Sequence, residues 1–436
     1  MTKNEFAKRR QRLIELMGDN SIAILPNAPI ANRNRDVDHI YRSDSNFHYL
    51  SGFDEPDSVI VIIPGRAHGE YILFCRERDL SKEIWDGYRA GQEGAIEQYA
   101  ADDSYPITDL DDILPGLMEN KDKVFYTMGN SPTFDQRIVG WLNHLRNASR
   151  QGKHSPTEIV ELDHSLNELR LFKSSAEIKA MKTAAEISCQ AHIRAMQFTQ
   201  AGKWEYQVEA EIIHEFMKND CRSPAYPSIV GGGENGCILH YIENNHRLKN
   251  NDLLLIDAGA EYDYYAADIT RTFPVNGKFT KAQKALYSIV LEAQKAAIAE
   301  VKPGNHWNQP HEAAVKVITQ GLLDLGLLKG KLETLIEKEK YREFYMHRTG
   351  HWLGMDVHDV GDYKVGGEWR LLEAGMVLTV EPGLYIRDPK TIDKKWHFIG
   401  IRIEDDVLVT KTGHEVITAA APKEIDEIEQ LMIQVE

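Results

Sequence analysis

The sequence predicts two domains in succession, an α/β domain followed by an α+β domain. The first third of the chain alternates short β-rich runs with helical stretches, which is typical of an α/β domain. The remainder contains long amphipathic helices with strands and hairpins between them, which favours helices covering a sheet. The 436 residues are sufficient for two domains with cores of their own.

The N-terminal part predicts these elements in order. Its first segment, MTKNEFAKRRQRLIELM, carries charges throughout and predicts an amphipathic helix rather than a secretory signal or a membrane anchor. Four β-rich runs follow, and their alternation with helices predicts a partly parallel sheet. These runs are SIAILP from Ser21, SVIVIIP from Ser58, YILFC from Tyr71 and KVFYTM from Lys123. The polar stretch 146–157 is expected to be a surface loop.

A capping box marks the start of the second domain. Ser174 and Glu177 have the spacing of this motif and predict a helix that runs to about Gln200. We therefore expect an N-terminal α/β domain over residues 1–172 and a second domain over residues 173–436.

Two further helices are predicted inside the second domain. Val208, Ile212 and Phe216 recur at four-residue spacing, which marks the apolar face of one helix. Thr280 and Gln283 form another capping box, and the helix that follows should end before Pro303–Gly304.

Charge and composition exclude several classes of partner. A net charge of −16 repels phosphate backbones, and no run of Lys or Arg with interleaved aromatics offsets it, so we expect no nucleic acid partner. No segment approaches the roughly 18 consecutive apolar residues of a membrane helix, so we expect no membrane and place the protein in the cytoplasm. The four cysteines are widely spaced, which argues against a zinc–thiolate site or a disulfide framework.

Two aspartates are expected to face each other on a hairpin within LLLIDAGAEYDYYAADITRTFP. A two-residue turn at Tyr262 and Asp263 would place Asp257 directly opposite Asp268. Directly opposed carboxylates repel each other, so a cation is expected between them. The alternative is a solvated aspartate at a strand end. It is disfavoured for Asp257, which ends the apolar run LLLI typical of a buried strand.

Glu381 and Glu404 form a second acidic pair. Glu381 follows the run MVLTV, and Pro382 favours an extended conformation for it. In GIRIEDDVLV, alternation places Arg402 and Glu404 on one face of a strand and the apolar residues on the other. The polar connection RDPKTIDKKW separates the two strands and fits a long hairpin. Taken alone, Glu404 is equally consistent with an exposed edge strand.

Three histidines, His347, His351 and His358, lie between these two hairpins in the segment HRTGHWLGMDVHD. Arg348 occupies the position at which the HExxH zinc motif requires glutamate, so that motif is excluded. One histidine joining four carboxylates would hold two divalent cations, whose charge the carboxylates balance. This oxygen-rich set favours Mn²⁺ or a similar ion over a structural zinc.

With these residues, the chain resembles the pita-bread metallopeptidases, specifically the bacterial aminopeptidase P group. The resemblance covers nearly the whole chain, in the segments RNRDVDHIYRSDSNFHYLSGF, ENGCILHY, IDAGAEY, DITRTFPVNGKFT, HWLGMDVHDVG, VLTVEPGLYI and GIRIEDD. It implies a pita-bread catalytic domain, removal of the N-terminal residue from peptides whose second residue is proline, and a homo-oligomer that is a dimer or a tetramer.

The resemblance also implies the site residues. The metal ligands would be Asp257, Asp268, His351, Glu381 and Glu404, and the substrate site would be lined by His240, His347 and His358. Asp36 would hold the substrate's amino group, and Trp85 and Arg150 would lie at subunit contacts, although an ordinary packing aromatic and a loop arginine are equally good interpretations of these last two. The family commonly has glycine where this chain has Arg348, which leaves the fine specificity open.

Roles for the remaining residues follow from the chemistry of such a site. We expect Glu381 to carry a proton to the leaving proline nitrogen, and His347 and His358 to donate hydrogen bonds to the substrate carbonyl. Arg402, on the same strand face as Glu404, is expected to orient a ligand carboxylate, with Tyr385 beside it.

Three alternatives remain at this point. A prolidase uses the same metal set on Xaa-Pro dipeptides and is the nearest of them. A methionine aminopeptidase is disfavoured by the long first domain. A non-catalytic pita-bread module typically lacks the ligand set, whereas all five positions are filled here.

Overall fold

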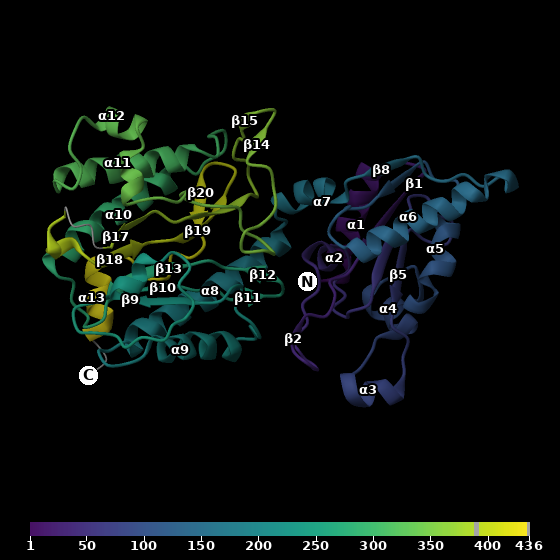
Figure 1. Cartoon of the computed structure of the whole chain (residues 1–436), viewed down its shortest axis with the longest axis horizontal. Helices are drawn as coiled ribbons and strands as arrows, with labels where there is room; N and C mark the ends of the chain where they lie inside the picture. Colours follow the sequence, from purple (N-terminus) through teal and green to yellow (C-terminus); the bar gives the residue numbers. More distant parts are fainter. Residues whose placement is uncertain (388–391, 434–436) are drawn as a thin grey trace. The chain divides into compact units, whose positions relative to one another are not determined.

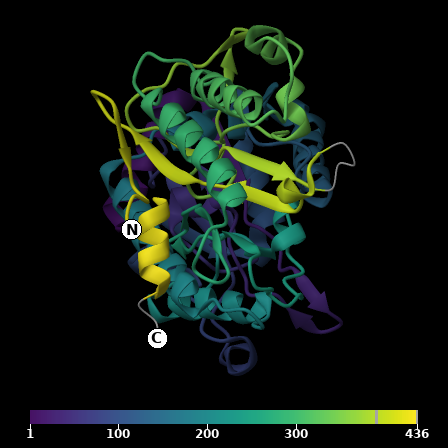
Figure 2. The same cartoon turned by 90° about the vertical axis from the view of Figure 1, so that its left-hand side faces the viewer.

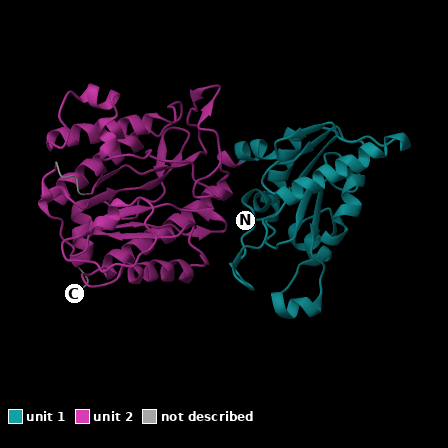
Figure 3. Ribbon diagram, viewed as in Figure 1, with its two compact units in different colours: residues 1–169 teal, residues 170–436 magenta. Residues whose placement is uncertain are grey.

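The computed structural model of the chain describes residues 1–387 and 392–433. The chain divides into two compact units, residues 1–169 and residues 170–436 (Figure 3). Their helices and strands are labelled in Figure 1. None of the helices in the described part is both long and apolar enough to span a membrane.

Unit 1 is built on a six-stranded mixed sheet in the order β6-β5-β4-β1-β7-β8. Its strands are β1 (Ser21–Pro26), β4 (Val59–Ile62), β5 (Tyr71–Cys75), β6 (Asp103–Pro106), β7 (Lys123–Phe125) and β8 (Glu158–Val160). The β1–β4 and β4–β5 pairs are antiparallel and the other three are parallel, so the predicted partly parallel sheet is confirmed. The two edge strands, β6 and β8, were not predicted, because their sequences DSYP and EIV are short and carry no apolar run.

Helices and one small hairpin complete this part of the chain. They are α1 (Lys3–Met17), β2 (Asn32–Asn34), β3 (Val37–Asp38), α2 (Ser45–Ser51), α3 (Leu80–Asp86), α4 (Gly91–Tyr99), α5 (Leu110–Met118), α6 (Pro132–Asn147) and α7 (Leu162–Leu171). Apolar side chains of α5 and α6 pack with those of β1 and β4 in one buried core. The surface loop predicted over 146–157 is shorter than expected, because α6 extends to Asn147 and a 3₁₀ turn, Ser149–Gln151, follows.

Unit 2 contains the predicted helices α8 (Ser175–Phe198), α9 (Glu205–Lys218) and α10 (Lys281–Ala299). It also contains α11 (Gln309–Asp324), α12 (Leu332–Glu337) and α13 (Ile425–Ile433), which were not predicted. Both predicted capping boxes are present: the side chains of Ser174 and Glu177 cap α8, and those of Thr280 and Gln283 cap α10. Val208, Ile212 and Phe216 are buried on one face of α9, as predicted.

Short strands lie between these helices. They are β9 (Ile229–Gly232), β10 (Leu253–Asp257), β11 (Glu261–Tyr262), β12 (Tyr265–Ala266), β13 (Thr270–Pro274), β14 (Lys364–Val365), β15 (Glu368–Trp369), β16 (Val377–Val380), β17 (Gly383–Ile386), β18 (Ile399–Arg402), β19 (Asp405–Val409) and β20 (His414–Val416). Helices α10 and α11 lie on one side of them and α8 and α9 on the other (Figures 1 and 2). β18 contacts both β10 and β13, which brings the strand ends of two hairpins together.

Candidate metal centre

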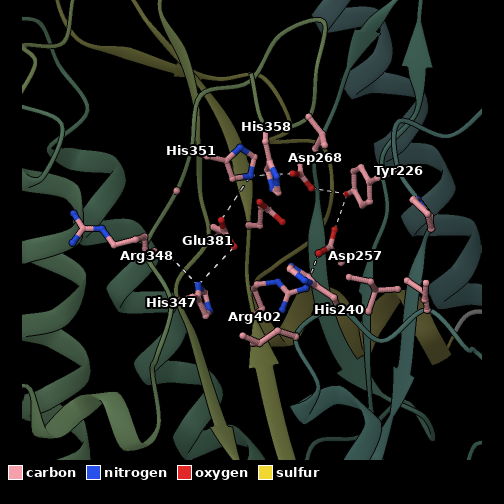
Figure 4. A pocket seen from close by; sticks show the side chains of 17 residues that line it. Tyr226, His240, Asp257, Asp268, His347, Arg348, His351, His358, Glu381 and Arg402 are labelled. Carbon is pink, nitrogen blue, oxygen red and sulfur yellow. Dashed lines mark hydrogen bonds and ion pairs between the residues drawn. The ribbon is translucent and has the colours of Figure 1, made fainter. Parts of the chain in front are cut away.

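A cavity of about 400 Å³ in unit 2 is lined by the four predicted carboxylates and His351 (Figure 4). The carboxylates come from two hairpins. Asp257 ends β10 and Asp268 lies two residues before β13. Glu381 lies between β16 and β17, and Glu404 lies between β18 and β19. Residues that are up to 147 positions apart in the sequence, Asp257 and Glu404, therefore share one cavity.

The turn predicted for the first hairpin is wrong by one residue. The turn residues are Asp263 and Tyr264, not Tyr262 and Asp263, and their φ angles are 51° and 69°. Two successive positive φ angles give the type of two-residue turn whose twist matches that of the strands, and aspartate tolerates this conformation better than most residues.

This shift changes how the two aspartates meet. Asp257 pairs with Thr270, so Asp268 lies diagonally across from it and not directly opposite. Moving the turn by one residue changes the strand partner by two, and side chains alternate with a period of two, so Asp268 stays on the predicted face. The hydroxyl of Tyr226 lies 2.6 Å from Oδ1 of Asp257 and 2.5 Å from Oδ1 of Asp268. One hydroxyl proton serves only one of these oxygens at a time, so Tyr226 alone does not offset the repulsion between the two carboxylates.

Glu381 and Glu404 face each other across the second hairpin. Val380 pairs with Asp405 and Gly383 pairs with Arg402, and the two glutamates lie between these pairs. The strand predicted to run through Glu404 is interrupted there, because the backbone N–H of Glu404 donates to the carbonyl of Thr270 and leaves the ladder. Glu404 is only 1% exposed, so the exposed edge strand is excluded. Part of the connection RDPKTIDKKW, residues 388–391, lies outside the described residues.

His351 is oriented for binding a cation. Its Nδ1 donates to the carbonyl of Trp352 at 3.0 Å, which directs Nε2 to the carboxylates. Nε2 lies 3.4 Å from Oδ2 of Asp268 and 3.8 Å from Oε1 of Glu381. Ligand atoms of Asp268, His351 and Glu404 all lie within 4.8 Å of one another.

The carboxylates strongly perturb one another's protonation. Burial raises the pKa of Glu381 to about 7, and Asp268 and Asp257 add to this rise against the charges of His351 and Arg402. Burial, with Asp268 and Glu381, also raises the pKa of Glu404 well above its usual value. Each shift reports negative charges that lack sufficient compensation.

The pKa of His351 is also raised, which favours the charged form of its ring. Burial alone lowers its pKa, but the hydrogen bond to Asp268 and the charges of Glu381 and Asp268 outweigh burial and raise that pKa to about 9. Because Nδ1 is bound to a carbonyl, the proton held in this way lies on Nε2, among the carboxylates. A divalent cation in the cavity would replace this proton and compensate the carboxylates, and an oxygen-rich donor set with one imidazole suits such ions. The residues present therefore fit divalent metal ions.

A chain of hydrogen bonds joins the carboxylates to His347. Arg402 donates through Nη2 to Oδ2 of Asp257 at 2.6 Å and through Nη1 to the hydroxyl of Tyr385 at 3.0 Å. The Tyr385 hydroxyl in turn lies 2.9 Å from Nε2 of His347, whose Nδ1 donates to the carbonyl of Arg348. Burial and Arg402 lower the pKa of His347 to about 3, so the ring is neutral. Both of its nitrogens are occupied, so His347 must exchange a partner before it can donate to a substrate.

The other predicted substrate residues lie in different places. His240 and His358 line the cavity, and the ring of His358 lies 4.4 Å from that of His351, edge to face. Asp36, Trp85 and Arg150 belong to unit 1. Asp36 lies in the exposed turn between β2 and β3, Trp85 is 86% exposed on α3, and Arg150 is exposed in the Ser149–Gln151 turn.

Three residues that hold the site together were not predicted. Tyr226 bridges the two aspartates, and the Thr270 hydroxyl donates to Oε2 of Glu404 at 2.6 Å. Glu205 is fully buried and accepts four hydrogen bonds from the segment that carries His240. Only Thr270 has a sequence signal, because it lies on the same strand face as Asp268.

Comparison with known families agrees with this site. The model of metallopeptidase family M24 matches residues 179–411, and that of the aminopeptidase P N-terminal domain matches residues 6–126. The chain belongs to metallopeptidase family M24. It is a metal-dependent hydrolase that carries the N-terminal domain of the aminopeptidase P members.

Individual relatives match over nearly their full length. The Xaa-Pro aminopeptidase of Escherichia coli is 44% identical over 434 residues, which cover 99% of this chain and 98% of that protein. The structure of the Pseudomonas aeruginosa aminopeptidase PepP matches with a TM-score of 0.99 and 58% identity, over 100% of this chain and 99% of the other. Proline aminopeptidase P II from Yersinia pestis matches with a TM-score of 0.97 and 46% identity over 100% of both chains. The expected α/β domain followed by an α+β pita-bread domain is confirmed.

Proposed function

We propose that this protein removes the N-terminal residue from peptides whose second residue is proline. One observation carries the proposal: four carboxylates and His351 meet in a single cavity of a chain that belongs to the M24 metallopeptidases. The relative from Escherichia coli, named Xaa-Pro aminopeptidase and matched over nearly its whole length, supports the choice of substrate.

We assign two divalent cations, Mn²⁺ in the first instance, to Asp257, Asp268, His351, Glu381 and Glu404. The charge of four carboxylates balances that of two such ions, and the oxygen-rich set supports Mn²⁺ over a softer ion. When bound, a pair of divalent cations lowers the pKa of a shared water and polarises the scissile carbonyl.

Glu381 is the proton carrier in this proposal. Its carboxylate borders the cavity, with Oε1 3.8 Å from Nε2 of His351, so it is placed to take a proton from water and release it. The acceptor is the nitrogen of the leaving proline. His358 donates a hydrogen bond to the carbonyl oxygen of the substrate as negative charge develops there, and His347 joins it after exchanging a ring partner.

The remaining residues position the substrate and the ligands. Arg402 and Tyr385 hold Asp257 and His347 in place through the hydrogen bonds described above. His240 lines the substrate side of the cavity, and Asp36 of unit 1 binds the free amino group. An imide nitrogen has no hydrogen, so a proline site needs apolar walls, and the cavity supplies Leu239, Ile242 and Val357.

The proposal also includes the domain boundaries, the assembly and the location of the protein. Residues 1–172 form the N-terminal domain and residues 173–436 the catalytic domain. The protein acts as a homo-oligomer, a dimer or a tetramer, in the cytoplasm, with Trp85 and Arg150 at subunit contacts. The exposure of both side chains supports the last assignment.

Peptide hydrolysis tests the function directly. The purified protein is assayed with an Xaa-Pro-Xaa tripeptide and an Xaa-Pro dipeptide, before and after chelation and with single metals restored. We expect tripeptide hydrolysis that chelation abolishes and Mn²⁺ restores. Preference for the dipeptide would indicate a prolidase instead. Failure to bind any divalent metal would indicate a non-catalytic module.

A further inference from the structure

Arg348 occupies a distinctive place at the edge of the metal cavity. It follows His347 directly and lines the cavity, but its side chain points away from the carboxylate cluster (Figure 4). Two contacts fix the guanidinium there: Nη2 donates to the side-chain carbonyl of Asn308, and Cζ lies 5.3 Å from the centre of the Trp369 ring. The charge is therefore positioned at the rim and is not part of the metal-ligand network.

A second cation lies on the same aromatic ring. Nζ of Lys364 is 4.4 Å from the centre of the Trp369 ring. Across residues 1–387 and 392–433, neither Arg348 nor Lys364 has a carboxylate within ion-pair distance, although the chain has a net charge of −16. Arg348 lines the cavity to which the proposed function assigns peptides, and two cations on one ring without an acidic partner are suited to binding an anion.

We propose that Arg348 and Lys364, held on Trp369, form a cationic rim that binds a carboxylate of the peptide beyond its proline. This inference rests on the proposed function, because it concerns the part of the peptide that leaves the metal site. An extended chain rises roughly 3.3 Å per residue, so groups after the proline lie away from the metals and towards the rim. The fork of an arginine matches a carboxylate in geometry and charge.

Two different groups of a peptide can supply this carboxylate: the C-terminus of a short peptide, or an acidic side chain at the third residue. Four substrates separate them: Ala-Pro-Ala, Ala-Pro-Ala amide, Ala-Pro-Glu amide and Ala-Pro-Gln amide. We expect kcat/KM to be up to about fivefold higher for a substrate with the carboxylate than for its neutral counterpart, mainly through KM. This ratio should fall towards one as the salt concentration rises.

Substitutions test whether the cationic rim causes the preference for substrates with a carboxylate. In Arg348→Met the ratio of the two kcat/KM values should fall to near one. Arg348→Lys should retain part of the preference for the carboxylate. Lys364→Met should lower the ratio by less than Arg348→Met does. Lys249→Met, a change at an exposed lysine of the same unit, is the charge-matched control and should leave the ratio unchanged.

The outcomes separate this inference from the function on which it rests. Wild-type protein that hydrolyses none of the four peptides contradicts the proposed function. Wild-type protein that hydrolyses all four without a carboxylate preference overturns only the rim, as does a preference that survives in Arg348→Met. A preference confined to the free acid identifies the C-terminus, and one confined to the glutamyl amide identifies the side chain.

Discussion

Arg402 donates a hydrogen bond of 2.6 Å to Oδ2 of Asp257, one of the proposed metal ligands. The same guanidinium donates to Thr270, which itself donates to Glu404, so Arg402 supports ligands from both hairpins. Supporting hydrogen bonds of this kind contribute about 10–100-fold to metal affinity.

Replacing Arg402 with methionine should therefore weaken Mn²⁺ binding by about that factor. Arg402→Lys keeps the charge but loses the forked guanidinium, so its affinity for Mn²⁺ should lie between those of the wild type and Arg402→Met. Titration calorimetry of the metal-free proteins measures the affinities. Equal affinities in all three proteins would show that Asp257 is oriented without this contact.

Glu381→Gln should lower kcat by about 10²–10⁴-fold, because the amide has no basic oxygen to carry a proton to the leaving nitrogen. Steady-state hydrolysis of an Xaa-Pro-Xaa tripeptide at saturating Mn²⁺ measures kcat for both proteins. The matched control is Glu373→Gln, an exposed glutamate that does not line the cavity. Full activity of Glu381→Gln would assign the proton transfer to another group.

Glu404→Gln should make the metal-free protein more stable. The pKa of Glu404 is raised by burial and by its acidic neighbours, so at pH 8 its ionisation opposes folding, whereas glutamine keeps the shape without the charge. We expect a higher thermal midpoint than wild type, by roughly 2–4 °C for each kcal/mol regained.

The same variant should lose the stabilisation that Mn²⁺ gives to the wild type, so scanning both proteins with and without metal completes the test. Glu427→Gln, at an exposed glutamate of α13, controls for the loss of a charge. A lower midpoint for metal-free Glu404→Gln would contradict the prediction.

Glu205→Ala should loosen the segment that carries His240. Four donors, from Gly232, Asn235, Tyr241 and His246, would lose their acceptor. The Asn235 and Tyr241 donors are buried, and each one left unsatisfied costs about 1–3 kcal/mol.

In addition to a lower denaturation midpoint, we expect a higher KM, since His240 lines the cavity. Glu186→Ala, at an exposed position of α8, should change neither quantity. A destabilised Glu205→Ala protein with unchanged KM would limit Glu205 to a role in stability.

His192 should make the protein less stable in mild acid. Burial lowers its pKa to about 4, with Arg271 acting in the same direction and the Ala258 carbonyl and Asp257 against it. The unfolded chain, with a histidine pKa of about 6.5, therefore binds a proton that the folded protein excludes. The contribution of His192 to the free energy of unfolding is fully present above about pH 6.5 and is lost as the pH falls towards 4. The change amounts to about 3 kcal/mol.

Urea denaturation at several pH values, with the metals bound, measures this dependence. His192→Gln should reduce the loss of stability between pH 6.5 and 5 relative to wild type. His144→Gln, at an exposed histidine, should not. Identical pH profiles for wild type and His192→Gln would show that other groups set the acid sensitivity.

The elements that depend on local rules were predicted correctly. The capping boxes at Ser174 and Thr280 depend on residues three positions apart, and the strand from Ser21 on a continuous apolar run. The turn after Tyr262 was misplaced because two-residue turns one position apart both keep Asp257 and Asp268 on one face, so the charge pattern does not distinguish them.

The residues that were missed act across large sequence separations. Thr270 and Glu404 are 134 positions apart, and Tyr226 and Asp268 are 42 apart. Neither periodicity nor capping rules relate such residues, because their contacts depend on how separate hairpins pack against each other.

The opposed pair Glu381 and Glu404 has paired strands on both sides, so the strand pairing itself sets how these carboxylates meet. Substitutions that keep the backbone of these strands in register should therefore leave the spacing of the two carboxylates unchanged. A single residue added beside Pro382 would have the opposite effect, because it would rotate one carboxylate out of the cavity.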